Sequence, residues 1–310
     1  MIKVFIDGKE GTTGLQIYER LGKRDDIDLI TLPEELRKDI NARRECLNSA
    51  DICFLCLPDA AAIESAGLVT NPNSKIIDAS TAHRTNHDWV YGLPELSEER
   101  RQAIKAAKRV ANPGCYATGF ITLVEPLVKA GIVSADYPFV AHAVSGYSGA
   151  GKKAIAQYES KDRDIALSSP REYALTLSHK HLPEMVRECR LLEKPIFNPY
   201  ICDYYCGMSV SVPLFKRLMA KKYSVNDVLE YFTEYYARQN FIKVVKSDEI
   251  PAFLPANELA GTNYLKIYVT GNDEQILLVS VFDNLGKGAS GAAVQNMNIM
   301  CGLDERTSLI

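Results

Sequence analysis

The N-terminal stretch constrains the fold more than any other part of the chain. A β-rich run, Ile2–Ile6, leads into a turn with glycines at positions 8, 11 and 14, and helical spacing continues from Leu15 to Leu21. Strand, glycine turn and helix in this order are typical of a dinucleotide-binding βα unit, in which a pyrophosphate meets free amides at the helix start. The spacing is G-x-x-G-x-x-G, so a glycine turn without a ligand is the alternative.

Strand and helix patterns then alternate. Strand patterns cover Ile27–Leu32, Ala50–Pro58, Lys75–Ser80 and Arg109–Ala111, and the short stretch Ala60–Ala66 is helical. This alternation predicts an α/β domain built on a Rossmann-type, doubly wound parallel sheet.

The end of the second predicted strand bears on the choice of cofactor. An NAD enzyme places Asp or Glu there to hold the ribose 2′-hydroxyl, and the strand ends without one. Arg37 and Lys38 follow soon after, and their charge favours the extra phosphate of NADP. Glu34 and Glu35 lie nearby, so the preference for NADP is modest.

Cys115 is the predicted nucleophile. Asn112-Pro113-Gly114 has turn chemistry, and the apolar run Phe120–Val128 after it predicts a buried helix. At a turn that passes into a helix, unpartnered amides and the helix dipole favour a thiolate. The alternative is a buried structural cysteine beside a tight turn.

The other cysteines predict no disulfide framework. Eight are scattered over 310 residues, and we expect no secretory signal at the start of the chain, so we expect reduced thiols. Cys53 and Cys56 form a C-x-x-C pair inside a predicted buried strand, where their side chains would point to opposite faces.

Beyond residue 116 the pattern changes to a mixed α+β domain with a mainly antiparallel sheet. We expect the exposed face of this sheet to carry an oligomer interface. A helix is predicted at 225–238, and strands are predicted at 137–144, 204–212, 241–245, 263–269 and 275–282.

A second glycine-rich turn, Asp283–Gly291, opens a predicted terminal helix, Ala292–Met300. Such a turn would return to the first domain and close over the nicotinamide half of the cofactor. A surface turn before an ordinary terminal helix is the alternative.

The formal net charge of −3 gives no electrostatic case for nucleic acid or an anionic membrane as partner. No apolar run approaches the length of a membrane span, so we expect a cytoplasmic protein with small-molecule partners.

His179 and His181 form the one histidine cluster that resembles a designed site. Further zinc ligands at recognisable spacing are missing, so we expect no metal. The two side chains would face the same way only in an extended segment, so we expect one of them to meet the thiol. A thiol, a histidine and a nicotinamide cofactor together indicate oxidation or reduction of an acyl group through a thioester.

Seven motifs in order resemble N-acetyl-γ-glutamyl-phosphate reductase of arginine biosynthesis, in its shorter type. They cover nearly the whole chain and are Asp7–Gly14, Asp78–Arg84, Tyr91–Glu95, Asn112–Tyr116, Ser145–Gly151, His179–Glu184 and Asn284–Ala289.

The resemblance implies NADPH-dependent reduction of N-acetylglutamyl phosphate to the semialdehyde with release of phosphate, by a homodimer or homotetramer. It implies a cofactor domain formed by residues 1–115 with 284–310, and a catalytic and dimerisation domain formed by residues 116–283.

The resemblance also assigns roles to residues. Cys115 is the acyl-accepting nucleophile, His181 our choice for the acid/base, and His179 a neighbour that binds substrate. The remaining assignments by resemblance are cofactor binding by Gly8, Gly11, Thr12, Thr13, Gly14, Asn284, Gly286, Lys287 and Gly288, and substrate binding by Arg84, Ser145, Gly146, Ser148 and Gly149. Arg37 is a further candidate for cofactor binding, because of its position after the second predicted strand. The longer type of the family has an aspartate and an aromatic residue where Ala82 and His83 stand, so His83 inherits no role from it.

Two alternatives stay open. Aspartate-semialdehyde dehydrogenase or an aminoadipyl-phosphate reductase would use the same chemistry on another substrate. A non-catalytic NADP-binding regulator would need the cofactor site but not Cys115 and the histidines.

Overall fold

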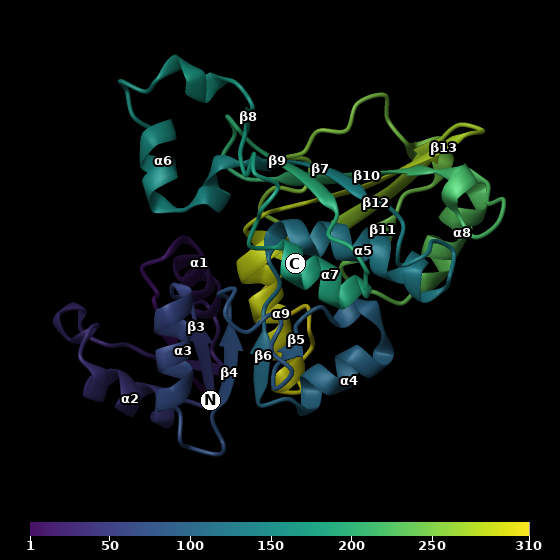
Figure 1. The fold of residues 1–310 in the computed structure, drawn as a ribbon. Coiled ribbons are helices and arrows are strands. Elements are labelled where there is room, and N and C mark those ends of the chain that lie inside the picture. Colours follow the sequence, from purple (N-terminus) through teal and green to yellow (C-terminus); the bar gives the residue numbers. More distant parts are fainter. Residues whose placement is uncertain (310) are drawn as a thin grey trace. The chain divides into compact units, whose positions relative to one another are not determined.

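The computed structural model describes residues 1–309, which form two compact units (Figure 1). The first contains residues 1–113 and the chain from 289 onward, and the second contains residues 114–288. Cys115 and residues 284–288 therefore lie in the second unit, whereas the sequence-based division placed them in the first domain.

The first unit is built on a six-stranded parallel sheet in the order β2-β1-β3-β4-β6-β5. This confirms the predicted Rossmann-type sheet. Its strands are β1 Ile2–Asp7, β2 Ile27–Ile30, β3 Ile52–Leu55, β4 Lys75–Asp78, β5 Val90–Tyr91 and β6 Arg109–Ala111. Its helices are α1 Thr12–Leu21, α2 Ile40–Ser49, α3 Asp59–Leu68, α4 Glu98–Ala106 and α9 Gly291–Met300.

The order of this sheet locates a ligand site. The chain passes from β1 to β2 on one side and then to β3 on the other, so the strand order reverses between β1 and β3. Ligands of doubly wound sheets bind at the carboxyl ends of the strands beside such a reversal. Helices α2 and α3 pack against each other, and α9 contacts α1 and β4.

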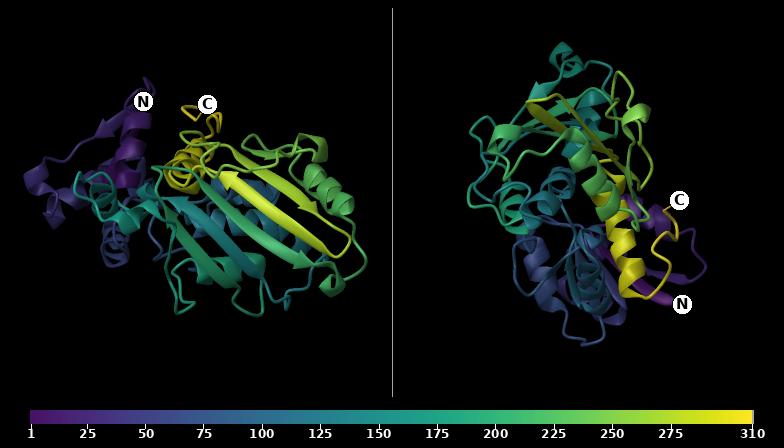
Figure 2. Two further views of the ribbon diagram at one scale, coloured as in Figure 1. Left: turned by 90° about the horizontal axis from the view of Figure 1, so that it is seen from above. Right: turned by 90° about the vertical axis from the view of Figure 1, so that its right-hand side faces the viewer.

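The second unit contains a seven-stranded mixed sheet in the order β11-β12-β13-β10-β7-β9-β8, seen in the left panel of Figure 2. Only the β7–β9 and β11–β12 pairs are parallel, which confirms the predicted, mainly antiparallel character. The strands are β7 Val140–Gly146, β8 Arg171–Glu172, β9 Ile196–Cys202, β10 Met208–Phe215, β11 Ile242–Val244, β12 Leu265–Gly271 and β13 Gln275–Phe282. The helices are α5 Cys115–Lys129, α6 Lys152–Tyr158, α7 Leu182–Cys189 and α8 Val225–Tyr235.

Helix α5 lies unusually close to this sheet. A Cβ atom at Gly119 would come within 2.6 Å of Val210 Cγ2 and 2.8 Å of Ser280 Oγ, so a glycine is needed at the contact. Nearly all residues of α5 after Cys115 are buried. Close packing against the mixed sheet therefore fixes the position of the helix that begins with Cys115.

Three strands were missed by the prediction, and a fourth begins later than predicted. β5 has two residues and β9 contains Pro199, which cannot donate to a ladder, so β5, β9 and the short β8 beside β9 were missed. The strand predicted from residue 204 begins at Met208, because Gly207 has a φ of 116° and interrupts the extended backbone.

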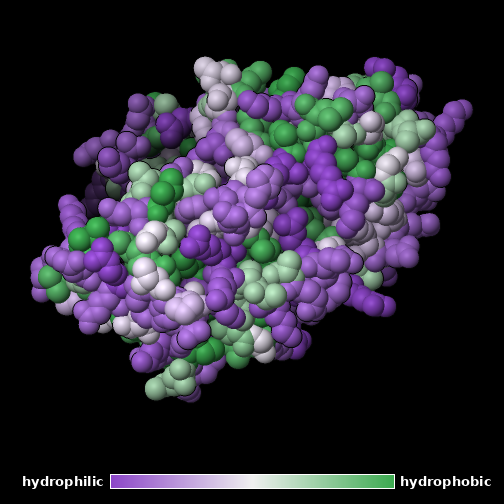
Figure 3. Space-filling model, turned by 60° about the horizontal axis from the view of Figure 1, so that its bottom comes forward, coloured by the Kyte–Doolittle hydropathy of each residue, from purple (hydrophilic) through white to green (hydrophobic). Residues whose placement is uncertain are grey.

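On the face shown in Figure 3, hydrophobic and hydrophilic side chains are interspersed. None of the helices within residues 1–309 is long and apolar enough to cross a membrane.

Candidate active site

Cys115 is the first residue of α5, as the turn chemistry predicted. Gly114 forms the N-cap and has no side chain to accept from the first amides of the helix. The Gly114 amide itself donates to Glu184 Oε2 at 3.1 Å, and the thiol of Cys115 is half-buried.

His181 and His179 lie together beside Tyr116, the residue after Cys115. The two imidazole rings meet edge to face at 4.7 Å, and their centroids are 5.9 Å and 5.7 Å from that of Tyr116. The segment is a turn, because the backbone amide of His181 donates to Nδ1 of His179 at 3.1 Å. Our premise that both rings would share a side only in an extended strand is therefore wrong.

Tyr173 belongs to the same cluster, and sequence reasoning missed it. Its hydroxyl lies 3.3 Å from His179 Nε2, and burial raises the pKa of the phenols of Tyr173 and Tyr116, so both stay protonated. Ala174 and Leu177 follow with φ of 55° and 54°, a left-handed backbone that non-glycine residues adopt only under constraint. No sequence pattern announces such a turn.

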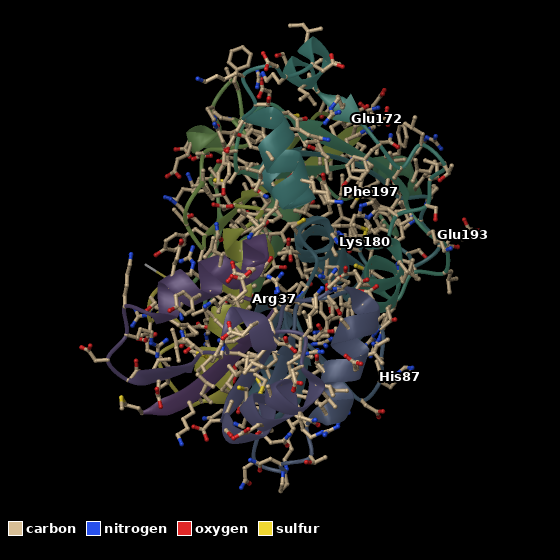
Figure 4. All side chains as sticks on the ribbon, turned by 90° about the vertical axis from the view of Figure 1, so that its left-hand side faces the viewer. Arg37, His87, Glu172, Lys180, Glu193 and Phe197 are labelled. Atoms are coloured by element: carbon tan, nitrogen blue, oxygen red, sulfur yellow. The ribbon has the colours of Figure 1, made fainter. Side chains whose placement is uncertain are left out.

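Phe197 of β9, labelled in Figure 4, packs against this cluster. Its ring meets those of Tyr116 and His179 edge to face, with centroids 5.2 Å and 5.1 Å away. The aromatic rings limit how far Tyr116 and His179 can rotate.

The predicted turn after β7 also belongs to the second unit. Ser145 is buried, and its hydroxyl donates to the Gly146 carbonyl at 3.1 Å, while the Tyr116 hydroxyl donates to the Tyr200 carbonyl at 3.3 Å. Ser148 Oγ accepts from Asn284 Nδ2 at 3.0 Å, while Asn284 Oδ1 accepts from the Gly207 amide at 2.8 Å. The predicted substrate-binding turn after β7 and the predicted cofactor-binding turn at 284–288 are thus in contact, although they lie far apart in the sequence.

The predicted turn at 284–288 lies against Cys115. A Cβ atom at Gly288 would come within 2.9 Å of Cys115 Cβ, and one at Gly286 would come within 2.0 Å of the Thr262 carbonyl oxygen. Lys287 between them is fully buried. Gly288 allows this close approach of the backbone to Cys115, and Gly286 allows the close approach to Thr262.

The glycine turn after β1 lies at a pocket of about 430 Å³ in the first unit. Gly8 has a φ of 87°, and a Cβ atom there would come within 2.4 Å of the Cys56 carbonyl oxygen. Helix α1 starts at Thr12 without a side-chain cap on its amides. The unbound amides at the start of α1 can bind the pyrophosphate of a dinucleotide, and the backbone conformation at Gly8, which only glycine adopts readily, leaves room for it.

Arg37, labelled in Figure 4, and Lys38 line this pocket together with Glu34. Arg37 Nη1 lies 3.3 Å from Glu34 Oε1, and both side chains are largely exposed. An exposed pair of this kind is weak, so the guanidinium remains available to a phosphate.

The Arg84 side chain binds two main-chain carbonyl groups of the first unit. Its Nε donates to the Asn112 carbonyl at 2.9 Å and Nη2 donates to the Ala79 carbonyl at 3.0 Å. The neighbouring His83 is also structural: Nδ1 lies 2.6 Å from Asp78 Oδ2, and the ring stacks on Trp89.

None of the eight cysteines forms a disulfide. Burial raises the pKa of Cys53 and Cys56 to about 12, and it raises the pKa of Cys46, Cys189, Cys202, Cys206 and Cys301 as well. Within residues 1–309, no three His, Cys, Asp or Glu side chains gather as a metal site would require.

The fold and the site define a semialdehyde dehydrogenase. The NAD-binding domain model of that family matches residues 10–105, and its dimerisation domain model matches residues 115–284. Aspartate semialdehyde dehydrogenase II from Vibrio cholerae has a similar fold, with a TM-score of 0.72 at 17% identity over 97% of this chain and 99% of that one. The enzyme from Francisella tularensis gives 0.69 at 15% identity over 97% and 100%.

The chain belongs to the N-acetyl-gamma-glutamyl-phosphate reductase family. It is 48% identical to the reductases of that name from Brucella ovis and Brucella canis over 97% of its own length and 99% of theirs. It is therefore an oxidoreductase with a domain for a nicotinamide dinucleotide.

Proposed function

We propose that the protein reduces N-acetyl-L-glutamyl 5-phosphate to N-acetyl-L-glutamate 5-semialdehyde, with NADPH as reductant and release of phosphate. The observation that carries this proposal is the position of Cys115 at the start of α5, against the turn at 286–288 and beside the cluster of Tyr116 and the two histidines. The relatives that share nearly the whole sequence bear the name of this activity.

In the proposed reaction the Cys115 thiolate attacks the acyl carbon of the acyl phosphate. The carbon–oxygen bond to phosphate breaks, phosphate leaves with the bond electrons, and the acyl group remains on sulfur as a thioester. NADPH, when bound, would supply a hydride to that carbon. The resulting hemithioacetal oxyanion on Cys115 re-forms the carbonyl and expels the Cys115 thiolate, which releases the aldehyde. Any proton that this oxygen takes up from the protein returns to the protein before the collapse.

We assign the proton transfers to His181. Both ring nitrogens of His179 already have partners, because Nδ1 accepts from the His181 amide and Nε2 lies 3.3 Å from the Tyr173 hydroxyl. With Nδ1 as acceptor, the neutral ring carries its proton on Nε2 and is a poor base. His179 is better suited to holding the substrate.

Substrate contacts are proposed for Ser145, Gly146, Ser148 and Gly149 of the turn after β7, and for Arg84. The proximity of Ser145 to Tyr116 supports the assignment of the turn. Two backbone carbonyls fix the position of Arg84, and we propose that its guanidinium serves an anionic group of the substrate.

For the cofactor, we propose that Gly8, Gly11, Thr12, Thr13 and Gly14 hold the pyrophosphate and that Arg37 meets the 2′-phosphate. The glycine geometry and the uncapped start of α1 support the first assignment. We further propose that Asn284, Gly286, Lys287 and Gly288 border the nicotinamide.

We propose a homodimer or homotetramer in the cytoplasm. The matched dimerisation domain model spans the mixed sheet, and the free thiols are those of a protein in a reducing compartment.

A direct assay tests the substrate. The purified protein is incubated with NADP, phosphate and either N-acetylglutamate semialdehyde or aspartate semialdehyde, and absorbance of the reduced cofactor is followed. We expect phosphate-dependent reduction with the acetylated substrate, at a kcat/KM at least about 100-fold above that for the aspartate compound, because a compound without the acetamido group leaves the polar groups of the site unpaired, which costs several kcal/mol. Preference for aspartate semialdehyde would contradict the proposed substrate, and absence of turnover with both would favour a regulator.

Cofactor choice gives a second test. We expect NADP to exceed NAD in kcat/KM, and Arg37→Ala to reduce that ratio about tenfold, since a hydrogen bond to a charged group contributes about 1.5 kcal/mol or more. Arg44→Ala is the matched control, because Arg44 is exposed on α2, pairs with Asn41 and does not line the pocket. A wild-type preference for NAD would show that the phosphate assignment is wrong.

A further inference from the structure

A buried ion pair in the first unit has no role in the reaction described above. Asp7 is the last residue of β1, Arg43 lies on α2, and their exposed fractions are 5% and 8%. Arg43 Nε and Nη2 donate to Asp7 Oδ2 at 3.2 Å and 3.1 Å, and Ser65 Oγ of α3 donates to the same oxygen at 2.8 Å. The pair therefore joins the end of β1 to helices α2 and α3.

Asp7 lies where a carboxylate is unfavourable for an anionic ligand. It directly precedes Gly8, the first glycine of the turn proposed to hold the pyrophosphate, and it lines the pocket of about 430 Å³. A negative charge in this pocket repels the phosphate groups of a dinucleotide. Within residues 1–309, the acidic and basic residues that line the pocket are equal in number, so they supply no net positive charge; they are Asp7, Glu10, Glu34, Lys9, Arg37 and Lys38.

Arg43 supplies a positive charge that the pocket lining lacks. It is not a lining residue and binds Asp7 from α2. Burial disfavours its charged form, yet the attraction of Asp7 and the hydrogen bonds to Glu64 and Asp7 raise the pKa of Arg43 above its ordinary value. Glu64 accepts from Nη1 at 3.0 Å but is half-exposed, so solvent screens its charge. Arg43 therefore compensates the charge of Asp7.

The same pair fixes the backbone from which the glycine turn begins. The Asp7 carbonyl accepts from the Cys56 amide at 2.8 Å, so its main chain and its side chain are both held. Gly8 follows with a φ of 87°, at a point where a Cβ atom would come within 2.4 Å of the Cys56 carbonyl oxygen. A shift of Asp7 would therefore displace the start of the turn.

We propose that Arg43 is a positioning and specificity residue of the cofactor site: it neutralises Asp7 from outside the pocket, which allows the pocket to bind the phosphate groups of NADP. The inference rests on the proposed cofactor site and deepens it. Arg43 acts through Asp7, so its effect depends on whether the Asp7 carboxylate is present.

Three variants of the full chain separate charge from structure. Arg43→Met removes the cation and leaves Asp7 without its counter-ion, whereas Asp7→Asn/Arg43→Met removes both charges. Arg43→Lys keeps the charge and loses the fork of donors. Arg44→Met is the matched control, because Arg44 is exposed on α2 and pairs with Asn41. The measurements are the Kd of NADP and of NAD by equilibrium titration, the midpoint of thermal unfolding, and kcat.

In Arg43→Met we expect the Kd of NADP to rise at least about tenfold and that of NAD at most about threefold, because NADP brings an additional phosphate to the uncompensated carboxylate. The double variant should return the ratio of the two Kd values to within about twofold of wild type and recover thermal stability, since no buried charge is then left unpaired. Arg43→Lys should keep that ratio within about threefold, because the cation remains. The kcat at saturating NADP should stay within about threefold of wild type throughout, since Cys115 lies in the other unit.

Equal losses of NADP and NAD affinity in Arg43→Met, or a ratio that stays low in the double variant, overturn charge compensation and leave only a structural role. Loss of the ratio in Arg43→Lys contradicts it as well, and this variant decides the question if Arg43→Met does not fold. A wild-type preference for NAD would instead refute the proposed cofactor, and the difference in Kd ratio between Arg43→Met and the double variant would still report on Arg43.

Discussion

Cys115→Ala is expected to fold, to bind NADP and to show no phosphate-dependent turnover. The proposed thioester forms on Cys115 sulfur, and alanine offers no nucleophile. The side chain is half-buried at a helix start, where alanine is a good helix former, so the structural cost should be small. Activity should fall by at least about 10⁴-fold, as expected when a covalent nucleophile is removed.

The measurements are equilibrium binding of NADP, thermal unfolding, and the rate of NADP reduction with phosphate and semialdehyde. Cys46→Ala is the matched control, because Cys46 is another half-buried cysteine on a helix, and burial raises its pKa. We expect the control to keep wild-type activity. Turnover by Cys115→Ala near the wild-type rate would exclude covalent catalysis.

His181→Asn is expected to lower kcat by about 10²–10⁴, which is typical for loss of a positioned acid or base, and to leave NADP affinity unchanged. His179→Asn should mainly raise KM for the acyl phosphate. His179 is less suited to proton transfer, since both of its ring nitrogens have partners in the protein.

Single-turnover formation of the thioester on Cys115 separates chemistry from product release and is the decisive measurement. His142→Asn provides the control, because this histidine is exposed on β7 with Asn198 as its neighbour. If His179→Asn suppresses thioester formation while His181→Asn leaves it intact, the two roles are reversed.

The parts of the site that were predictable have local causes. Asn112-Pro113-Gly114 is turn chemistry in any context, and the apolar run after it demands a buried helix, so Cys115 had to open α5. The glycine turn after β1 is similar, because a left-handed Gly8 and the start of α1 both depend on residues close in sequence.

The positions of other site residues could not be predicted, because tertiary contacts place these residues in the site. Tyr173 reaches His179 through a left-handed turn at Ala174 and Leu177 that their residue types disfavour. The sequence did not predict β9, because Pro199 interrupts its strand pattern. In the structure β9 pairs with β7 on one side and with β8 on the other.

The sequence by itself determined the parallel character of the first sheet, the mainly antiparallel character of the second, the position of Cys115 at the start of a helix and the family, because these depend on periodicity, turn residues and motif order along the chain. Only the tertiary structure decided that Gly288 lies against Cys115, that His179 has both nitrogens occupied and that Glu184 joins α7 to α5. Sequence spacing does not fix any of these contacts. They arise from the packing of helices, strands and turns within the second unit.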